Sequence, residues 1–379
     1  MTPLSFPPPP AADVEALRRE VRDFLREALA TRSPRDRSRT WTAHDPAFSR
    51  RIGERGWLGM TWPKRYGGHE RSALERYVVL EEMLAAGAPV AAHWIAERQS
   101  GPLILKVGTD EQRAFFLPRI AAGECFFCIG MSEPDSGSDL AATRTRAVPT
   151  ADGYRVTGTK LWTTFAHKAH YMILFCRTSP GERHEGTSQL LVDLSLPGVT
   201  IRPIIDLSGE EHFNEVVFDD VLLPRSALLG REGGGWEQVM SELAFERSGP
   251  ERILASFRLL VEFLRALGQR EDERARVAIG RLTAHLVVLR RLSRSVAGML
   301  QKGENPALQA AVVKDLGTGF EQEIPEVIRL LIDETPALEG RGDLSAVLAQ
   351  LMLLAPAFSI RGGTREILRG IIARGLGLR

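Results

Sequence analysis

The chain has 379 residues, of which 44% are hydrophobic and 26% charged, and its formal net charge is +1 at pH 7. This length and composition are typical of a globular protein of about two or three domains, and the balanced charge argues against nucleic acid or an anionic membrane surface as the main partner. Three cysteines, an odd number in a chain of this size, fit a reducing compartment better than a disulfide framework. We therefore expect a cytoplasmic protein.

The ends of the chain show no sign of export or membrane insertion. Residues 1–10 contain four consecutive prolines and no basic residue, so they lack the charged region of a signal peptide. The most apolar window, 344–358, is interrupted by Gln350 and Pro356 and is too short to span a bilayer. We expect no membrane span and interpret this window as a core helix.

Apolar residues at helical spacing dominate the first third of the chain. The first amphipathic segment begins at Val14, and Asp13 is a candidate cap for it. Glycines and prolines separate the segments that follow, at 48–55, 72–85 and 111–120. We predict an N-terminal α-helical domain over residues 1–124.

From Cys125 the apolar period changes toward two, which indicates strands. Ala151-Asp152-Gly153 is a candidate hairpin turn between two of them. Short strands at this spacing favour a small sandwich or barrel, so we predict a middle β domain over residues 125–234. The candidate strands are 125–130, 143–148, 153–158, 171–178, 187–194, 199–204 and 213–222.

After the glycines at 233–235 the helical period returns. Four long apolar patterns follow, and four helices of this kind close naturally as a bundle. We therefore predict a C-terminal four-helix bundle over residues 235–379, and an α+β multi-domain fold for the whole chain. The four patterns run around 253–264, 282–299, 312–331 and 344–354.

One loop combines turn residues with hydroxyl side chains directly after an apolar run. It extends from Gly130 to Asp139 and reads Gly-Met-Ser-Glu-Pro-Asp-Ser-Gly-Ser-Asp. Pro134 and Gly137 favour a turn, and serine hydroxyls beside unpaired backbone N–H groups suit a polar heteroaromatic ring or a phosphate. Taken alone, the loop is explained as well by an ordinary turn between two strands.

Two further stretches favour the ligand interpretation. Gly158-Thr159-Lys160-Leu161-Trp162-Thr163-Thr164 follows the loop, and residues 360–367 read Ile-Arg-Gly-Gly-Thr-Arg-Glu-Ile. In this order and spacing the three stretches resemble the acyl-CoA dehydrogenase family of flavoproteins. The resemblance extends to residues 56–68 and 213–224, and so covers nearly the whole chain. It implies α,β-dehydrogenation of an acyl-CoA thioester with FAD, and an electron-transferring flavoprotein as the electron acceptor.

The resemblance also implies which residues contact the ligands. An isoalloxazine ring has an apolar face and a polar edge, and a loop that alternates Met with Ser offers groups for both. The alternative for Trp162 is a plain core aromatic residue. The implied substrate contacts are Ser138, Arg247 and Gly363. The implied flavin contacts are Ile129, Met131, Ser132, Gly137, Ser138, Trp162, Thr164, Thr364 and Glu366.

The catalytic base is expected at a less common position. Removal of the α proton of an acyl-CoA requires a carboxylate, and many members of the resembled family place it before the Gly-Thr of the C-terminal motif, where this chain has Gly362. A branch that acts on branched or long acyl chains instead places a Glu before an Arg on a bundle helix, which implies Glu246 followed by Arg247. We expect Glu246 to be the base, with a branched, long or bulky acyl group as substrate. If that helix continues, Pro250 predicts a kink.

Two other functions remain open. The Arg-x-x-Phe-Gly segment with which many family members reach a neighbouring flavin is absent, and residues 331–343 show no clear match to the family's adenine-end segment. The first alternative, which these missing segments suggest, is that the chain is a half-site or non-catalytic subunit of a hetero-oligomer. If it is not, we expect a homodimer, a homotetramer or a hetero-tetramer with a related subunit. A flavin oxidase or monooxygenase on the same fold is the second alternative.

Two residue pairs invite a metal interpretation that the sequence does not favour. Cys125 and Cys128 form a Cys-x-x-Cys pair, but no second pair accompanies it, so buried strand cysteines are the simpler explanation. His167 and His170 have no acidic ligand in register. We expect no metal site.

Overall fold

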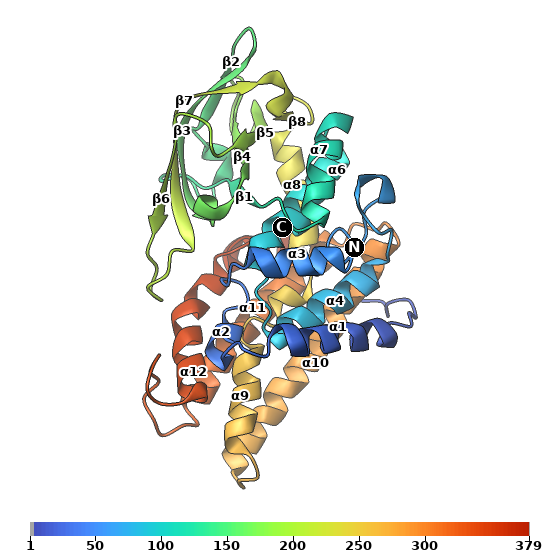
Figure 1. The fold of residues 1–379 in the computed structure, drawn as a ribbon, viewed down its shortest axis with the longest axis vertical. Helices are drawn as coiled ribbons and strands as arrows, with labels where there is room; N and C mark the ends of the chain where they lie inside the picture. Colours follow the sequence, from blue (N-terminus) through green and yellow to red (C-terminus); the bar gives the residue numbers. More distant parts are fainter. Residues whose placement is uncertain (1–3, 379) are drawn as a thin grey trace. The chain divides into compact units, whose positions relative to one another are not determined.

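The computed structural model describes residues 4–378, and the side chains of residues 242–246 lie outside the described part. Figure 1 labels most of its helices and strands. The chain forms two compact units. The first comprises Met1–His44, Arg71–Val90 and Leu243–Arg379, and the second comprises Asp45–Glu70 and Ala91–Glu242. Each unit is thus assembled from segments that are far apart in the sequence.

A mixed eight-stranded sheet forms the main part of the second unit (Figure 1). Its strand order is β6-β7-β3-β2-β4-β5-β8, and β1 pairs in parallel with β4. Each predicted strand is present, and the predicted turn at 151–153 joins the antiparallel strands β2 and β3. The strands are β1 Phe127–Gly130, β2 Arg146–Pro149, β3 Gly153–Thr164, β4 Tyr171–Arg177, β5 Thr187–Asp193, β6 Val199–Ile204, β7 Phe213–Pro224 and β8 Leu228–Leu229.

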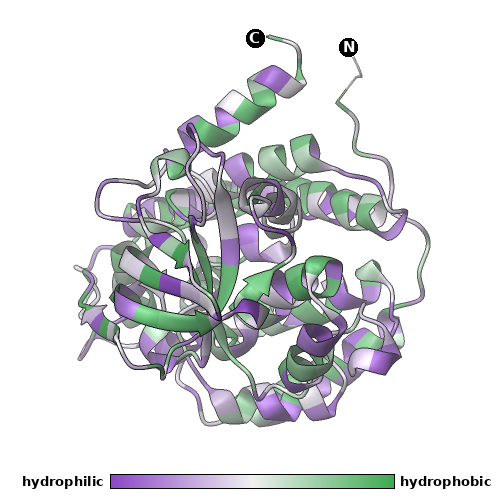
Figure 2. Ribbon diagram, turned by 90° about the horizontal axis from the view of Figure 1, so that it is seen from above, coloured by the Kyte–Doolittle hydropathy of each residue, from purple (hydrophilic) through white to green (hydrophobic). Residues whose placement is uncertain are grey.

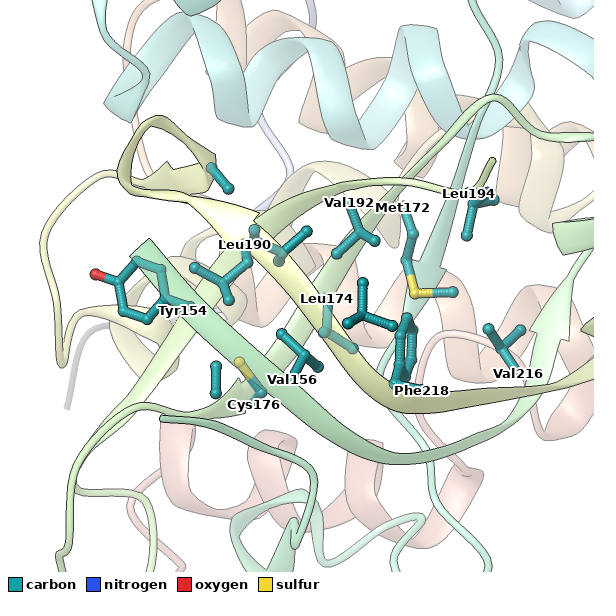
Figure 3. Close-up of a cluster of buried hydrophobic side chains, with 14 of the residues drawn as sticks. Tyr154, Val156, Met172, Leu174, Cys176, Leu190, Val192, Leu194, Val216 and Phe218 are labelled. Carbon is teal, nitrogen blue, oxygen red and sulfur yellow. The ribbon is translucent and has the colours of Figure 1, made fainter. Parts of the chain in front are cut away.

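Inward-pointing side chains from four of these strands make up the core of the sheet. Val156 of β3, Leu174 of β4, Val192 of β5 and Phe218 of β7 are almost completely buried and point toward one another (Figure 3). Figure 2 colours the ribbon by hydropathy; β3 and β7 alternate between buried and more exposed residues, whereas β4 and β5 are buried along nearly their whole length. Burial of the apolar face is the main stabilising contribution, at about 25 cal/mol for each Å² removed from water.

The helices of the second unit include one that the sequence analysis did not predict. Residues 91–107 form a continuous helical stretch, in which a π-helical turn, Ala96–Ser100, lies between α5, Ala91–Ile95, and α6, Gly101–Val107. Gly101-Pro102 looks like a break in the sequence, but Pro102 is tolerated because it falls in the first turn of α6. The helices predicted at 48–55 and 111–120 are present as α3, Pro46–Glu54, and α7, Asp110–Ala121.

The first unit is helical, and the predicted C-terminal helical domain is confirmed. Helix α10 packs against α11 and α4, and α12 packs against α9 (Figure 1). Among the described residues no helix is long and apolar enough to cross a membrane. The helices are α1 Glu15–Ala28, α2 Pro34–Ser38, α4 Ala73–Ala86, α9 Phe257–Leu267, α10 Glu273–Gln301, α11 Ala307–Arg329, α12 Asp343–Leu354 and α13 Arg365–Gly375.

Three local expectations were wrong. The N-cap of α1 is Val14 and not Asp13, although the Asp13 carboxylate accepts a hydrogen bond from the N–H of Glu15 at 3.4 Å. Helix α8, Gly235–Glu246, ends before Pro250, which opens a short 3₁₀ turn and so produces no kink. Because of this turn the next helix begins later in the sequence than expected, at Phe257 and not near residue 253. The domain boundaries expected at residues 124 and 234 stay predictions.

Candidate functional site

The loop 131–138, which follows β1 in the second unit, forms a tight turn. The backbone N–H of Glu133 donates to the Ser136 carbonyl at 2.7 Å, and the reverse bond is 3.2 Å long. Met131 and Ser132 are half-buried, whereas Gly137 and Ser138 are exposed. A Cβ atom at Gly137 would meet nothing within 4 Å. The second half of the loop therefore borders open space, as a ligand-contacting loop must.

Strand β3 anchors this loop through hydrogen bonds. The N–H of Leu161 donates to the Ser132 carbonyl at 2.8 Å, and the Lys160 ammonium donates to the Met131 carbonyl at 3.0 Å. The same ammonium lies 2.8 Å from Oε1 of Glu133 in a salt bridge whose two side chains are 0% and 6% exposed. Hydrogen bonds and a salt bridge therefore connect the loop to β3, the strand that carries Trp162.

The Glu133 carboxylate is surrounded by donors. Its oxygens accept hydrogen bonds from the Thr143 hydroxyl at 2.5 Å and from the backbone N–H groups of Arg144 and Thr145 at 2.7 and 2.9 Å. Burial by itself would raise the pKa of Glu133, but the Lys160 charge and these hydrogen bonds outweigh it and lower the pKa to about 2. The Glu133 carboxyl is therefore ionised at neutral pH.

Trp162 has an unusual backbone conformation. Its φ is +60°, a left-handed value that is strained for a bulky residue, and the register between β3 and β7 shifts between Lys160 and Thr163. The indole is 56% exposed, and its nearest aromatic neighbour, Phe213, lies edge-on at 6.1 Å between ring centroids. Trp162 is thus not a plain core aromatic residue, because the bulge turns it outward.

The residues around Trp162 fit a flavin ring. The exposed indole offers an apolar face, and the half-buried Ser132 and Thr164 offer hydroxyl groups for a polar edge. The Thr163 hydroxyl is buried and has no hydrogen-bond partner among the described residues, so this segment retains an unused polar group. Ile129 is half-buried at the end of β1. The predicted contacts Ile129, Met131, Ser132, Gly137, Ser138, Trp162 and Thr164 all belong to this unit.

In the first unit, the C-terminal motif begins with two glycines in left-handed conformations. The φ angles are +67° at Gly362 and +92° at Gly363, which only glycine adopts without strain. The Arg247 Nε donates to the Gly362 carbonyl at 3.1 Å, and the Lys314 ammonium donates to the Gly363 carbonyl at 2.8 Å. Two buried cations therefore hold this turn. Sequence reasoning proposed Arg247 as part of the site but missed Lys314.

A buried carboxylate of α11 also anchors this turn. Glu321 is 0% exposed and accepts hydrogen bonds from the backbone N–H of Ala255 at 2.8 Å and from Arg361 at 3.1 Å. Burial raises the pKa of Glu321, against the opposing effects of the Arg361 charge and the Ala255 N–H. Sequence reasoning missed Glu321, although a glutamate on the apolar side of a helix indicates a buried partner.

The end of the motif starts a helix. The Thr364 hydroxyl accepts a hydrogen bond from the N–H of Ile367 at 3.4 Å and so caps α13. The side chain of Glu366 is exposed, and hydrogen bonds from its own backbone N–H and from the Thr364 hydroxyl lower its pKa. Arg365 is fixed by Asp315 of α11 at 2.7 Å. Both predicted flavin contacts of this segment thus lie at a helix N-terminus.

The side chain of the predicted base, Glu246, lies outside the described residues, and its role stays a prediction. Its backbone forms the last residue of α8. Arg247 follows outside the helix and is 5% exposed, so the two residues are not successive positions of one helix as expected.

The cysteines and histidines considered for metal binding have other partners. Cys125, Cys128 and Cys176 are free and buried, and burial raises the pKa of the thiols of Cys125 and Cys176 to about 12. His170 Nδ1 accepts a hydrogen bond from the Phe126 N–H at 3.0 Å, and His167 Nδ1 lies 2.8 Å from Oδ1 of Asn214. Within the described part of the chain no group of three His, Cys, Asp or Glu residues could hold a metal ion.

Comparison with protein families decides the identity of the fold. The model of the acyl-CoA dehydrogenase N-terminal domain matches residues 11–124, that of the middle domain residues 128–221, and that of the C-terminal domain residues 233–377. The chain belongs to the acyl-CoA dehydrogenase family. It is an acyl-CoA dehydrogenase, and membership of this family implies a flavin cofactor.

Relatives within the acyl-CoA dehydrogenase family match over nearly the full length. The chain is 34% identical to acyl-CoA dehydrogenase IpdE1 of Mycobacterium tuberculosis, over 97% of this chain and 98% of the relative. The structure is similar to a solved protein named Tcur3481-Tcur3483 steroid ACAD, with 28% identity and a TM-score of 0.87 over 99% of this chain and 100% of that one. The ChsE4-ChsE5 complex from Mycobacterium tuberculosis is 31% identical, with a TM-score of 0.84 over 98% of both chains.

Proposed function

We propose that this acyl-CoA dehydrogenase acts on a CoA thioester with a bulky, branched or long acyl group, and that Glu246 removes the α proton. The observation that carries the proposal is the hydrogen bond from Arg247 to the carbonyl of Gly362. It attaches the residue next to Glu246 to the turn where many family members have their base. A carboxylate at the end of α8 would therefore be well placed to replace the missing one.

FAD is the proposed cofactor, and it would accept the β hydride of the substrate. The half-buried Met131 and Ser132 and the exposed Trp162 would hold the ring, with Gly137, Ser138 and Thr164 beside them and Ile129 at the base of the loop. Thr364 and Glu366 would supply the remaining contacts from the N-terminus of α13, where the helix dipole favours an anionic group. Ser138, Arg247 and Gly363 are the proposed substrate contacts.

Two observations support a bulky substrate. Gly362 has no side chain where many family members carry a glutamate, so the proposed acyl group would not compete with a carboxylate at this position. The relative of similar fold named as a steroid ACAD supports an acyl group of the size of a steroid or a steroid fragment. The volume of the substrate cavity sets the length and ring content of the acyl group that the enzyme accepts. Activity measured on a panel of acyl-CoA substrates determines both.

An electron-transferring flavoprotein is the proposed electron acceptor, and a homo-oligomer or a hetero-tetramer with a related subunit is the proposed assembly. Two solved structures of similar fold are named as pairs of chains, Tcur3481-Tcur3483 and ChsE4-ChsE5. These names favour the second candidate function, in which this chain is one half of a hetero-oligomeric dehydrogenase. Flavin content of the chain purified alone and with a co-expressed related subunit distinguishes the two assemblies.

The base is tested with Glu246→Gln. Loss of a general base typically slows the chemical step by about a hundred- to ten-thousand-fold, so the variant should retain FAD and lose flavin reduction by an acyl-CoA. Rapid mixing with the best substrate of the panel measures the rate of flavin bleaching. Glu237→Gln is the matched control, because Glu237 lies on the same helix with its side chain 78% exposed. A Glu246→Gln enzyme that bleaches at nearly the original rate would place the base elsewhere.

The oxidase and monooxygenase alternative needs a separate measurement. After anaerobic reduction by substrate, a dehydrogenase that uses a protein acceptor should reoxidise slowly in air. Reoxidation in air as fast as turnover would instead assign direct reaction with oxygen.

A further inference from the structure

The buried pair of Glu133 and Lys160 makes more hydrogen bonds than its own salt bridge. Glu133 is 7% exposed and Lys160 is 0% exposed. Removing two such charges from water costs several kcal/mol per ion, which their attraction offsets only with good geometry and further hydrogen bonds. An apolar pair could fill the same space at no such cost. The question is therefore what this pair provides that packing alone does not.

Each hydrogen bond of the pair fixes one point of a different backbone segment. Lys160 donates to the carbonyl of Met131 at the start of the loop. Glu133, inside the loop, accepts from the N–H groups of Arg144 and Thr145, which lead into β2. Thr143 joins the two charges, because its hydroxyl donates to Glu133 and accepts from Lys160 at 3.2 Å. The pair thus connects the loop, the β2 approach and β3.

This anchoring explains how the strained backbone of Trp162 persists. A left-handed bulky residue costs about 1–3 kcal/mol and survives only where its surroundings fix it. Lys160 is two residues before Trp162, and Leu161 between them is bonded to the Ser132 carbonyl. On the other side, the Thr163 carbonyl accepts from the Asn214 amide at 2.9 Å. The bulge is therefore held at both ends, and the loop is held to the same strand.

From this arrangement we infer that Glu133 and Lys160 are positioning residues for the flavin. They hold the 131–138 loop and the outward-facing Trp162 in the binding arrangement before the cofactor arrives. The inference rests on the proposed function for the identity of the ligand. In this role the two side chains act through the loop and Trp162 and do not contact the flavin ring themselves. Pre-organisation of this kind raises affinity because the ordering cost is met during folding and not on binding.

The test is Lys160→Met, with two readouts on the folded protein. In the flavin-free chain, the Leu161 amide should exchange its hydrogen faster, because its bond to Ser132 opens more often once the loop is released. The dissociation constant for FAD should rise about tenfold or more. Arg258→Met is the matched control: Arg258 forms a buried salt bridge of similar exposure with Glu262 on α9, in the other unit. It should lower stability and change neither readout.

Thr143→Val gives the milder form of the same test and decides the case if Lys160→Met does not fold. It removes one hydroxyl that bridges the two charges and leaves both charges in place. A smaller change in both readouts, in the same direction, is expected. Folded variants whose Leu161 exchange and FAD affinity equal those of the unchanged chain would overturn the inference. If the unchanged chain binds no FAD, the proposed function fails, and the Leu161 exchange alone still decides whether the pair positions the loop.

Discussion

The loop at 131–138 and the turn at 361–365, one in each unit, are both anchored by a buried glutamate and a cation. The pKa values of the two glutamates are nevertheless shifted in opposite directions. The pKa of Glu133 is lowered to about 2, whereas that of Glu321 is raised. Burial alone would raise both pKa values, so burial is not what distinguishes them. The number and type of donors around each carboxylate makes the difference.

Glu133 accepts from an ammonium group, a hydroxyl and two backbone N–H groups, whereas the Glu321 carboxylate accepts from one backbone N–H and from the guanidinium of Arg361. The cation also differs, because Lys160 is fully buried and the Arg361 side chain is 25% exposed. A partly hydrated cation interacts more weakly with a buried anion. A buried glutamate is therefore a strong anchor only where the fold supplies enough donors for its charged form.

Replacement of Glu133 by Gln should have the largest effect. One pKa unit corresponds to about 1.4 kcal/mol, so a shift from 4.5 to about 2 means that loss of the charge should lower the free energy of unfolding by about 3 kcal/mol at pH 7. Because the folded pKa lies below that of the unfolded chain, this contribution is complete above about pH 4.5 and is lost as the pH falls toward 2. Urea unfolding of both proteins at several pH values measures the difference. A difference that does not shrink below pH 4.5 would show that the lost stability is not electrostatic.

Replacement of Gly363 by Ala should have an intermediate effect. A left-handed φ costs an alanine about 1–2 kcal/mol, and the new Cβ would lie 3.2 Å from Nη2 of Arg247. Gly340→Ala is the control, since Gly340 has φ +82° and nothing within 4 Å of its Cβ. The excess destabilisation of Gly363→Ala over this control reports the contact with Arg247. Equal unfolding free energies for the two variants would mean that Arg247 moves aside freely.

Replacement of Glu321 by Gln should have the smallest effect, below about 1 kcal/mol at pH 7, because the amide avoids the cost of a buried charge and its oxygen can still accept from the Ala255 N–H. The raised folded pKa means that the natural chain gains stability as the pH falls through that pKa toward the unfolded value near 4.5. The variant should lack this gain, so its deficit should grow on acidification. This trend is the reverse of the one for Glu133→Gln. A deficit that is large at pH 7 would contradict the contrast between the two sites.

The sequence predicts the fold and the loop because both depend on local signals. Alternating apolar residues indicate the strands, and Pro134 and Gly137 mark the turn whatever surrounds it. The partner of Glu133 is 27 residues away in the chain, so no local pattern connects the two. One signal was available: Lys160 occupies an inward position of β3, and a lysine there requires a buried acceptor.

Other parts of the site depend on tertiary contacts that sequence periodicity does not report. The outward turn of Trp162 results from a bulge between β3 and β7, which only the pairing of the two strands reveals. Lys314 lies 49 residues from the carbonyl of Gly363 to which it donates. The four predicted C-terminal patterns did not include α13, although Thr364 is a typical N-cap residue.

The buried cysteines make this chain convenient for attaching a probe. Thiol reagents attack the thiolate, and the three native thiols are inaccessible, with pKa values raised by burial. A maleimide dye should therefore leave the folded native chain unlabelled. A single cysteine introduced at the exposed Asp135 would then carry the only label, at the tip of the 131–138 loop. A change in the surroundings of that loop on flavin binding would then be visible by fluorescence without removal of any native residue from the core.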